Sequence, residues 1–422
     1  MTKGELHNSF RHHSLSWFSS PSFLSFITMG LFQRKREDAD SSESSKKEKG
    51  SWRRPANTAF KQQRLKAWQP ILTPKTVLPT FFVIGLLFAP IGALLIWGSG
   101  KVSEMTFDYT DCEIQTPSTS PDDLQFFDMK DFSYNLKAGS TNAPFSTPQF
   151  AFLNRSDDTS LNVGERVQCY VQFDVPVDLD PTVLFYYKLT NFYQNHRRYV
   201  KSLDSDQLKG KAVSAGSLKG GDCKPLDINA DGKAIYPCGL IANSYFNDTY
   251  TPLNLTTDSA TTYTFSESGI AWPGEAKKYT DKPDYDLADI VPPPNWGAKF
   301  PNNYTEDNPP PNLKEDEHFQ NWMRTAGLPT FTKLWGRNDN DKLLKGRYQM
   351  AVNLNFPVRT YKGRKAIVIS TVSWIGGKNP FLGWAYIATA SLFVLLAILG
   401  TIRHMIKPRK LGDMTLLSWN RQ

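Results

Sequence analysis

Six histidines and four cysteines are the residues of this 422-residue chain best suited to hold a metal ion or act as nucleophiles. The histidines are scattered, unlike the clustered ligands of a zinc site. The cysteines form no C-x-x-C pair, which argues against thiol redox catalysis. Gly376-Gly377-Lys378 lacks the upstream glycine and the following Ser or Thr of a phosphate-binding loop. The sequence therefore predicts no catalytic residue, no metal ion and no cofactor.

The segment His196-Arg197-Arg198 is a basic cluster that could bind a partner. Two adjacent guanidinium groups can hold a phosphate or an acidic loop, but they can equally form a structural salt-bridge cluster. The sequence leaves both interpretations open. Asp and Glu are plentiful, yet no pair stands out as the acid and base of a glycosidase. We therefore predict a membrane-anchored binding or scaffold subunit rather than an enzyme, with Arg197 and Arg198 as candidate partner contacts.

Two long apolar segments contain no charged residue, which is typical of membrane-spanning helices. The first extends over Val77–Trp97 and the second over Phe381–Ile402. Each reaches the length of about 20 residues with which an α-helix crosses a bilayer. Inside lipid a helix satisfies its own backbone hydrogen bonds. We predict transmembrane helices over residues 76–100 and 379–402, neither of which offers an ionisable group for an ion path.

The charge of the chain is divided between its ends and its middle. Residues 1–75 contain 14 Lys and Arg against 6 Asp and Glu, and residues 403–422 contain 5 against 1. Residues 101–378 contain 30 against 34. By the positive-inside rule, both basic tails face the cytosol and the long loop lies outside it. The net charge of +8 thus indicates attraction to an anionic inner leaflet, and it does not argue for nucleic acid.

The N-terminal tail, residues 1–75, is predicted to be largely disordered. Its residues 34–51 form a Ser-rich segment of mixed charge. Residues 58–68 have two interpretations: a short helix on the inner membrane surface, or a solvated basic segment.

All four cysteines lie between the two spans, as expected if they pair in an oxidising lumen. Four cysteines allow three pairings. A bridge from Cys223 to Cys238 would close a short loop and contribute about 3 kcal/mol in the chain-entropy model. We favour this bridge together with Cys112–Cys169.

Four N-x-S/T sequons lie in the same loop and none lies in the tails. A single sequon is weak evidence, but this distribution agrees with an extracytosolic loop. The predicted glycosylation sites are Asn154, Asn247, Asn254 and Asn303.

The loop between the spans has strand signals. Apolar and polar residues alternate over Val167–Phe173 and Tyr348–Phe356, as in half-buried strands of an antiparallel sheet. Residues 182–189 and 366–374 are rich in β-branched and aromatic residues. Residues 315–324 are the best helix candidate. We predict a membrane protein in which two transmembrane helices flank a large β-rich extracytosolic domain, residues 101–378, resembling an antiparallel β-sandwich with short helices and long loops.

Small residues recur every seven positions in the second span, at Gly383, Ala390 and Ala397. Small side chains let another helix approach closely in lipid. We predict that this face contacts the first span or a larger membrane partner, against the alternative that the spacing arises by chance.

Several long segments resemble the cell division control protein 50 family, the accessory subunits of type IV P-type ATPases that move phospholipids. The resemblance covers about residues 57–386 and leaves out the first fifty residues and the end of the chain. The segments that carry it are Asn57–Leu65, Trp68–Ile71, Asn191–Ser202, Pro237–Thr249, Trp322–Thr330 and Gly376–Gly383.

The resemblance implies a non-catalytic role. A member of this family forms a heterodimer with the catalytic ATPase, is needed for exit of the ATPase from the endoplasmic reticulum, and supports its phosphorylation cycle. ATP hydrolysis and lipid transport reside in the partner. The resemblance also implies a glycan on Asn247, and it leaves open residence in the endoplasmic reticulum, Golgi, endosome or plasma membrane.

A two-span homo-oligomeric channel or a cell-surface receptor is the alternative function. Both have cytosolic tails and a disulfide-bonded outer domain. A channel should line its pore with polar residues, whereas these spans contain few of them.

Overall fold

The structure is a computed structural model that describes residues 57–66, 72–408 and 414. The chain divides into two compact units, Met1–Ile71 and Leu72–Gln422. In the first unit, the described residues form turns, and Gln63 has a left-handed φ of 53°. This φ interrupts helical hydrogen bonding, so the short helix considered for residues 58–68 does not form over 58–66. The rest of that segment, and nearly all of the tail predicted to be disordered, lies outside the described residues.

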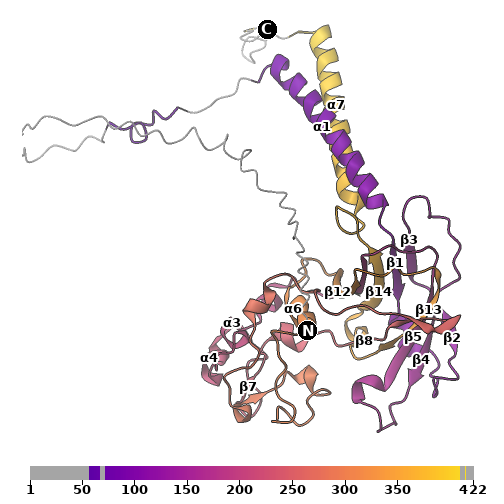
Figure 1. The fold of residues 1–422 in the computed structure, drawn as a ribbon. Coiled ribbons are helices and arrows are strands. Elements are labelled where there is room, and N and C mark those ends of the chain that lie inside the picture. The colour runs from indigo at the N-terminus through magenta and orange to yellow at the C-terminus, as the bar shows by residue number, and fades with distance from the viewer. Residues whose placement is uncertain (1–56, 67–71, 409–413, 415–422) are drawn as a thin grey trace, which may run out of the picture. The chain divides into compact units, whose positions relative to one another are not determined.

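Two long apolar helices belong to the second unit. They are α1, Pro74–Gly100, and α7, Pro380–Ile406. Figure 1 shows them side by side, leaving the same end of the β-rich domain. Only 17% of the apolar window of α1 and 11% of that of α7 is buried. A core helix of a soluble protein would bury far more, so these helices require an apolar solvent. The chain is a membrane protein, and we call α1 and α7 together the membrane hairpin.

The first large sheet, sheet A, has the strand order β12-β6-β14-β1-β3, and all of its pairs are antiparallel. Its central strands β14 and β1 connect directly to the membrane hairpin. The strands of sheet A are β1 Glu104–Asp108, β3 Phe132–Asn135, β6 Val183–Thr190, β12 Phe331–Asn338 and β14 Arg364–Thr371.

The second large sheet, sheet B, has the order β10-β9-β13-β5-β4-β2, with β8 also paired to β13. The inner faces of the two sheets meet where Phe107 of β1 stacks on Phe173 of β5 with ring centroids 4.4 Å apart. This packing confirms the predicted antiparallel sandwich. The strands of sheet B are β2 Phe126–Asp128, β4 Gln149–Asn154, β5 Val167–Val175, β8 Thr249–Tyr250, β9 Leu253–Leu255, β10 Asp258–Tyr263 and β13 Gly346–Asn353.

The predicted strands are confirmed, but two of them end earlier than expected. Strand β13 stops at Asn353 because the backbone N–H groups of Asn355 and Phe356 donate to the carboxylate of Asp248 instead of to a neighbouring strand. Strand β14 stops at Thr371, before a turn at Gly376 with φ of 106°. The predicted helix is α6, Glu317–Met323.

A long excursion between β6 and β12 carries most of the short helices. It attaches to sheet A where Phe246 stacks on Tyr187 at 3.9 Å. Besides β8, β9 and β10 of sheet B, its elements are α2 Arg197–Lys201, α3 Ser205–Leu208, α4 Ala215–Gly220, α5 Leu240–Asn243, α6, and the parallel pair β7 Ala234–Ile235 and β11 Ile290–Val291. The 3₁₀ helices of the domain are η1 Thr110–Ile114, η2 Val163–Glu165, η3 Glu275–Lys278, η4 Leu287–Asp289, η5 Pro294–Trp296 and η6 Arg359–Tyr361.

Candidate interaction surfaces

The small residues of the second span lie in the contact between α1 and α7. Gly383, Ala390 and Ala397 are buried on α7. A Cβ atom on Gly92 of α1 would lie 2.9 Å from the carbonyl oxygen of Gly383, and one on Gly85 would lie 3.2 Å from that of Ala390. The backbones thus approach as closely as small residues allow. Of the two contacts predicted for this face, the structure contains the one with the first span.

A polar junction fixes the membrane hairpin to the sandwich. The amine of Lys378, just before α7, donates to the carbonyl oxygens of Val102 at 3.1 Å, Asn135 at 2.8 Å and Leu136 at 3.1 Å. Burial lowers the pKa of Lys378, although the carboxylate of Glu104 opposes this shift. These charge-assisted bonds link the residue before α7 to the chain just after α1 and to the end of β3. They hold the hairpin in a defined orientation to sheet A.

The predicted basic contacts lie on helix α2. The ring of Tyr199 anchors this helix against Phe192 at 5.9 Å, and its hydroxyl is 2.7 Å from that of Ser244. Arg197 and Arg198 are exposed, and neither forms an ion pair with another described residue. The structural salt-bridge interpretation is therefore wrong within the described part of the chain, and both guanidinium groups are free to bind.

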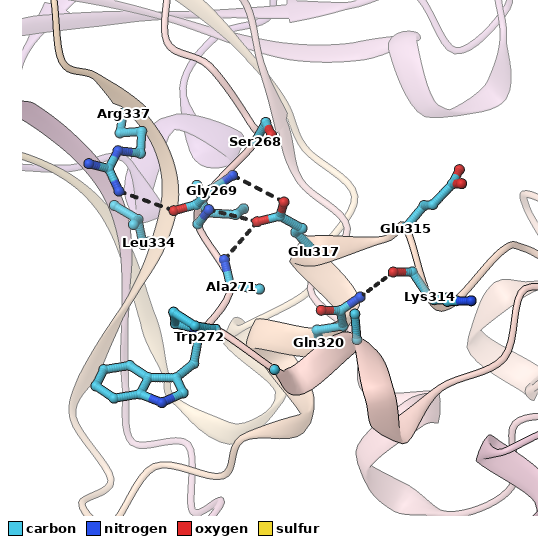
Figure 2. Close-up of a pocket in the computed structure, with 14 residues that line it drawn as sticks. Ser268, Gly269, Ala271, Trp272, Lys314, Glu315, Glu317, Gln320, Leu334 and Arg337 are labelled. Atoms are coloured by element: carbon cyan, nitrogen blue, oxygen red, sulfur yellow. Dashed lines mark hydrogen bonds between the residues drawn. The ribbon is translucent and has the colours of Figure 1, made fainter. Parts of the chain in front are cut away.

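A pocket of about 810 Å³ lies between α6 and residues 268–274 (Figure 2). The carboxylate of Glu317 accepts hydrogen bonds from the backbone N–H groups of Gly269, Ile270 and Ala271 at 2.7–3.0 Å. Burial favours its neutral form, but these three donors prevail and lower the pKa of Glu317. The carboxylate thus holds the loop that carries Trp272. Its acceptors are occupied by backbone donors, so the pocket offers no free acid or base at this position.

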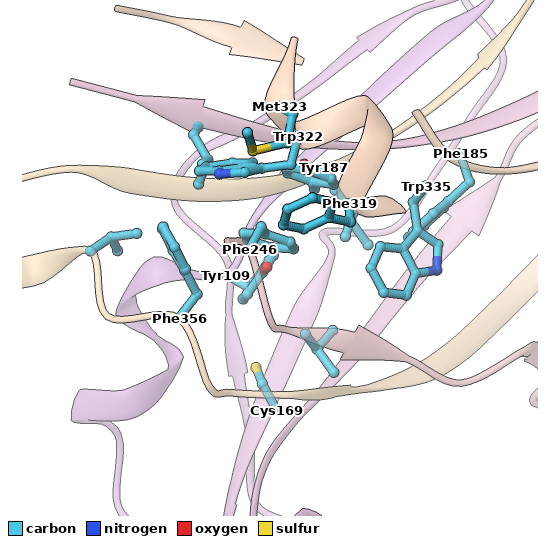
Figure 3. Close-up of a cluster of buried hydrophobic side chains, with 14 of the residues drawn as sticks. Tyr109, Cys169, Phe185, Tyr187, Phe246, Phe319, Trp322, Met323, Trp335 and Phe356 are labelled. Atoms are coloured by element: carbon cyan, nitrogen blue, oxygen red, sulfur yellow. The ribbon is translucent and has the colours of Figure 1, made fainter. Parts of the chain in front are cut away.

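An ion pair lies in the centre of the domain. The amine of Lys365 is 2.9 Å from the carboxylate of Asp248, and these side chains are 1% and 0% exposed. The hydroxyl of Tyr109 also donates to Asp248 at 2.9 Å. Burial, followed by the charge of Asp248, raises the pKa of Tyr109 well above its usual value. The amine of Lys365 lies 5.4 Å from the centroid of the Tyr109 ring. Figure 3 shows this ring in a buried cluster together with Phe246 and Phe356.

This pair has a structural role. The second oxygen of Asp248 accepts from the backbone N–H groups of Asn355 and Phe356, and the amine of Lys365 also donates to the carbonyl oxygen of Phe356 at 2.9 Å. Asp248 and Lys365 therefore use their charges to hold other groups of the same domain in place. Sequence reasoning missed this site; its one local signal was a lysine directly before the apolar run Ala366–Ile369. Among the described residues, no group of three His, Cys, Asp or Glu side chains could hold a metal ion.

The four cysteines form the two disulfides that the sequence favoured, Cys112–Cys169 and Cys223–Cys238. The first joins η1 to β5 of sheet B, and the second closes a loop in the excursion. The four sequon asparagines, Asn154, Asn247, Asn254 and Asn303, are all exposed.

Comparison with known proteins identifies the family. Residues 95–410 match the model of the LEM3 (ligand-effect modulator 3) family / CDC50 family. The chain belongs to this family. The match extends from the end of α1 through the sandwich and α7, so it includes the junction, the buried ion pair and both disulfides.

Relatives from distant organisms agree with the family model. The phospholipid-transporting ATPase accessory subunit CDC50 of Chaetomium thermophilum is 42% identical over 87% of this chain and 91% of its own length. The accessory subunit CRF1 of Saccharomyces cerevisiae is 42% identical over 93% of this chain and 95% of its own. Cell cycle control protein 50A of Bos taurus is 40% identical over 83% of this chain and 90% of its own length.

Proposed function

We propose that this chain is the non-catalytic accessory subunit of a type IV P-type ATPase that transports phospholipids, and that the two form a heterodimer. The observation that carries the proposal is the family match across the hairpin and the sandwich, together with relatives named as accessory subunits of phospholipid-transporting ATPases. The chemistry of the catalytic cycle then belongs to the partner.

The architecture suits this role. A sandwich mounted firmly on a membrane hairpin can bind outer loops of a neighbouring membrane protein at a fixed height above the bilayer. If it binds one conformation of the ATPase more tightly than another, it shifts the cycle toward that conformation. Exposed and unpaired, Arg197 and Arg198 are proposed contacts for acidic groups of the partner. Gly383, Ala390 and Ala397 contribute by fixing the shape of the hairpin that the partner meets.

The proposed topology places the β-rich domain outside the cytosol and both tails inside it. The basic excess of the tails, the two disulfides and the exposed sequons support this orientation. Residence in the endoplasmic reticulum, followed by the Golgi, endosomes or plasma membrane together with the ATPase, is part of the proposal.

Glycosylation tests this topology. Each of four single variants replaces one of Asn154, Asn247, Asn254 and Asn303 by Gln. Each variant should lose the mass of one glycan and migrate faster than wild type in an electrophoresis gel. After enzymatic removal of all N-glycans, wild type and variants should migrate alike. A sequon engineered into the C-terminal tail should stay unmodified and serves as the control. A glycan on the tail sequon, with none in the loop, would show that the orientation is the reverse of the one proposed.

The function is tested by removing the chain from its own cells. The partner ATPase should then be retained in the endoplasmic reticulum, and wild-type chain should restore its export. Normal export and normal phospholipid transport without this chain would contradict the proposal.

A further inference from the structure

The outer face of sheet B is a polar surface whose side chains bond to one another. Neighbouring strands place Asn254, Gln349, Gln172 and Gln149 in one row across it. The side-chain amide of Gln172 donates to that of Gln349 at 2.6 Å, and Thr262 donates to Asn254 at 3.1 Å. Because these polar groups bond to each other, the face needs no partner to satisfy them.

Two sequons, those of Asn247 and Asn254, lie on this face. Asn254 is exposed on β9, and Asn247 precedes β8 with the orientation of Thr249, which pairs with Asn353. The intervening Asp248 points inward to Lys365. Asn154, at the end of β4, is also exposed, but it pairs with Val167 and so has the orientation of the inner-facing Phe150 and Phe152. Three of the four sequons of the chain thus belong to strands of sheet B or the residues beside them, and the strands of sheet A contain none.

The outer face of sheet A has a different chemistry. Ala366, Val368 and Ser370 of its central strand β14 are buried. A cavity of about 260 Å³ lies on this face and is lined by the half-buried Asp108, Lys188 and Arg364. Arg364 is paired with Asp108 at 2.8 Å, but the amine of Lys188 contacts no carboxylate among the described residues. An unpaired cation in a polar hollow is a feature that a partner can complement.

Sheet A is also the sheet that continues into the membrane. Its adjacent strands β1 and β14 follow α1 and precede α7, and Lys378 ties this junction together. The free arginines of α2 follow β6 of the same sheet, and Asn191 bonds to the carbonyl oxygen of Tyr361 at 2.7 Å next to β14. Sheet A thus connects the hairpin at one end of its strands to α2, which follows the opposite end.

We infer that the outer face of sheet A is the side that binds the outer loops of the catalytic partner, and that the outer face of sheet B is covered by the chain's own N-glycans. N-glycans are bulky and solubilising, so a face that carries them stays in solvent. The occupant of sheet A supplies a carboxylate to Lys188. This assignment rests on the proposed function, because it presupposes an ATPase partner with extracytosolic loops.

Two single substitutions create new sequons on the opposite faces. Lys188→Asn forms Asn-Leu-Thr190 on sheet A, and Thr262→Asn forms Asn-Tyr-Thr264 on sheet B. Each variant, expressed as the full chain in cells with the tagged ATPase, is checked for the extra glycan by mobility. Lys188→Gln and Thr262→Gln are the matched controls without a sequon.

The glycosylated Lys188→Asn chain should lose at least tenfold in recovery with the ATPase, whereas glycosylated Thr262→Asn should be recovered as wild type. Equal recovery of both glycosylated chains, or loss confined to Thr262→Asn, would overturn the assignment. If wild-type chain itself captures no ATPase, the proposed function fails instead.

A second measurement covers the case in which Lys188→Asn is not glycosylated or does not fold. Lys188→Cys should react with a membrane-impermeant maleimide in the isolated chain and be at least tenfold slower in the complex. Thr262→Cys should react equally in both. Equal reactivity of Lys188→Cys in the two states would contradict a partner on sheet A.

Discussion

Replacing Lys365 by Met should lower the free energy of unfolding of the β-rich domain by about 3–5 kcal/mol, the usual effect of removing one partner of a buried ion pair. The carboxylate of Asp248 would remain fully buried without its cation. The same carboxylate holds the backbone of Asn355 and Phe356, so the chain after β13 should loosen as well. Thermal melting of the detergent-purified chain measures the loss.

A double-mutant cycle extends this prediction. Adding Asp248→Asn to the Lys365→Met chain should restore part of the lost stability, because a neutral amide needs no cation and can still accept from the backbone. Lys188→Met is the matched control, a half-exposed lysine without a carboxylate partner, and it should change stability by no more than about 0.5 kcal/mol. If the Lys365→Met chain has the same melting temperature as the Lys188→Met control, the ion pair contributes little to stability.

Leucine at both Ala390 and Ala397 should reduce recovery of the catalytic partner by about tenfold or more. Both side chains are buried against α1, and overpacking costs about 1–3 kcal/mol at each site. The helices would separate, and the hairpin would present an altered surface to the ATPase. Co-purification in mild detergent measures the change.

The same substitution on the other side of the helix is the control for this experiment. Ala388 is exposed on α7, so Ala388→Leu should leave the α1–α7 contact and the melting temperature unchanged. Unchanged recovery of the ATPase with Ala390→Leu and Ala397→Leu combined would show that close packing of the hairpin is not required for assembly.

Local chemistry made much of the fold predictable. The bilayer demands an uninterrupted apolar helix, so α1 and α7 are visible as composition alone. Strand β5 alternates in sequence because one face meets sheet A and the other carries the amide row. The disulfides followed from the position of the cysteines between two spans.

The features that were missed depend on contacts between distant parts of the chain. Lys378 bonds to carbonyls near the start of the domain, and Asp248 meets Lys365 only after the sandwich has closed. No local period marks such residues. The early end of β13 has the same origin, since the competing acceptor, Asp248, comes from the excursion.

The mass of the complex purified in mild detergent from the chain's own cells tests the central claim most directly. One copy of this chain with one copy of a large P-type ATPase is the expected composition, and the isolated chain should hydrolyse no ATP. A homo-oligomer of this chain without an ATPase, or ion conductance from the purified chain alone, would contradict the account.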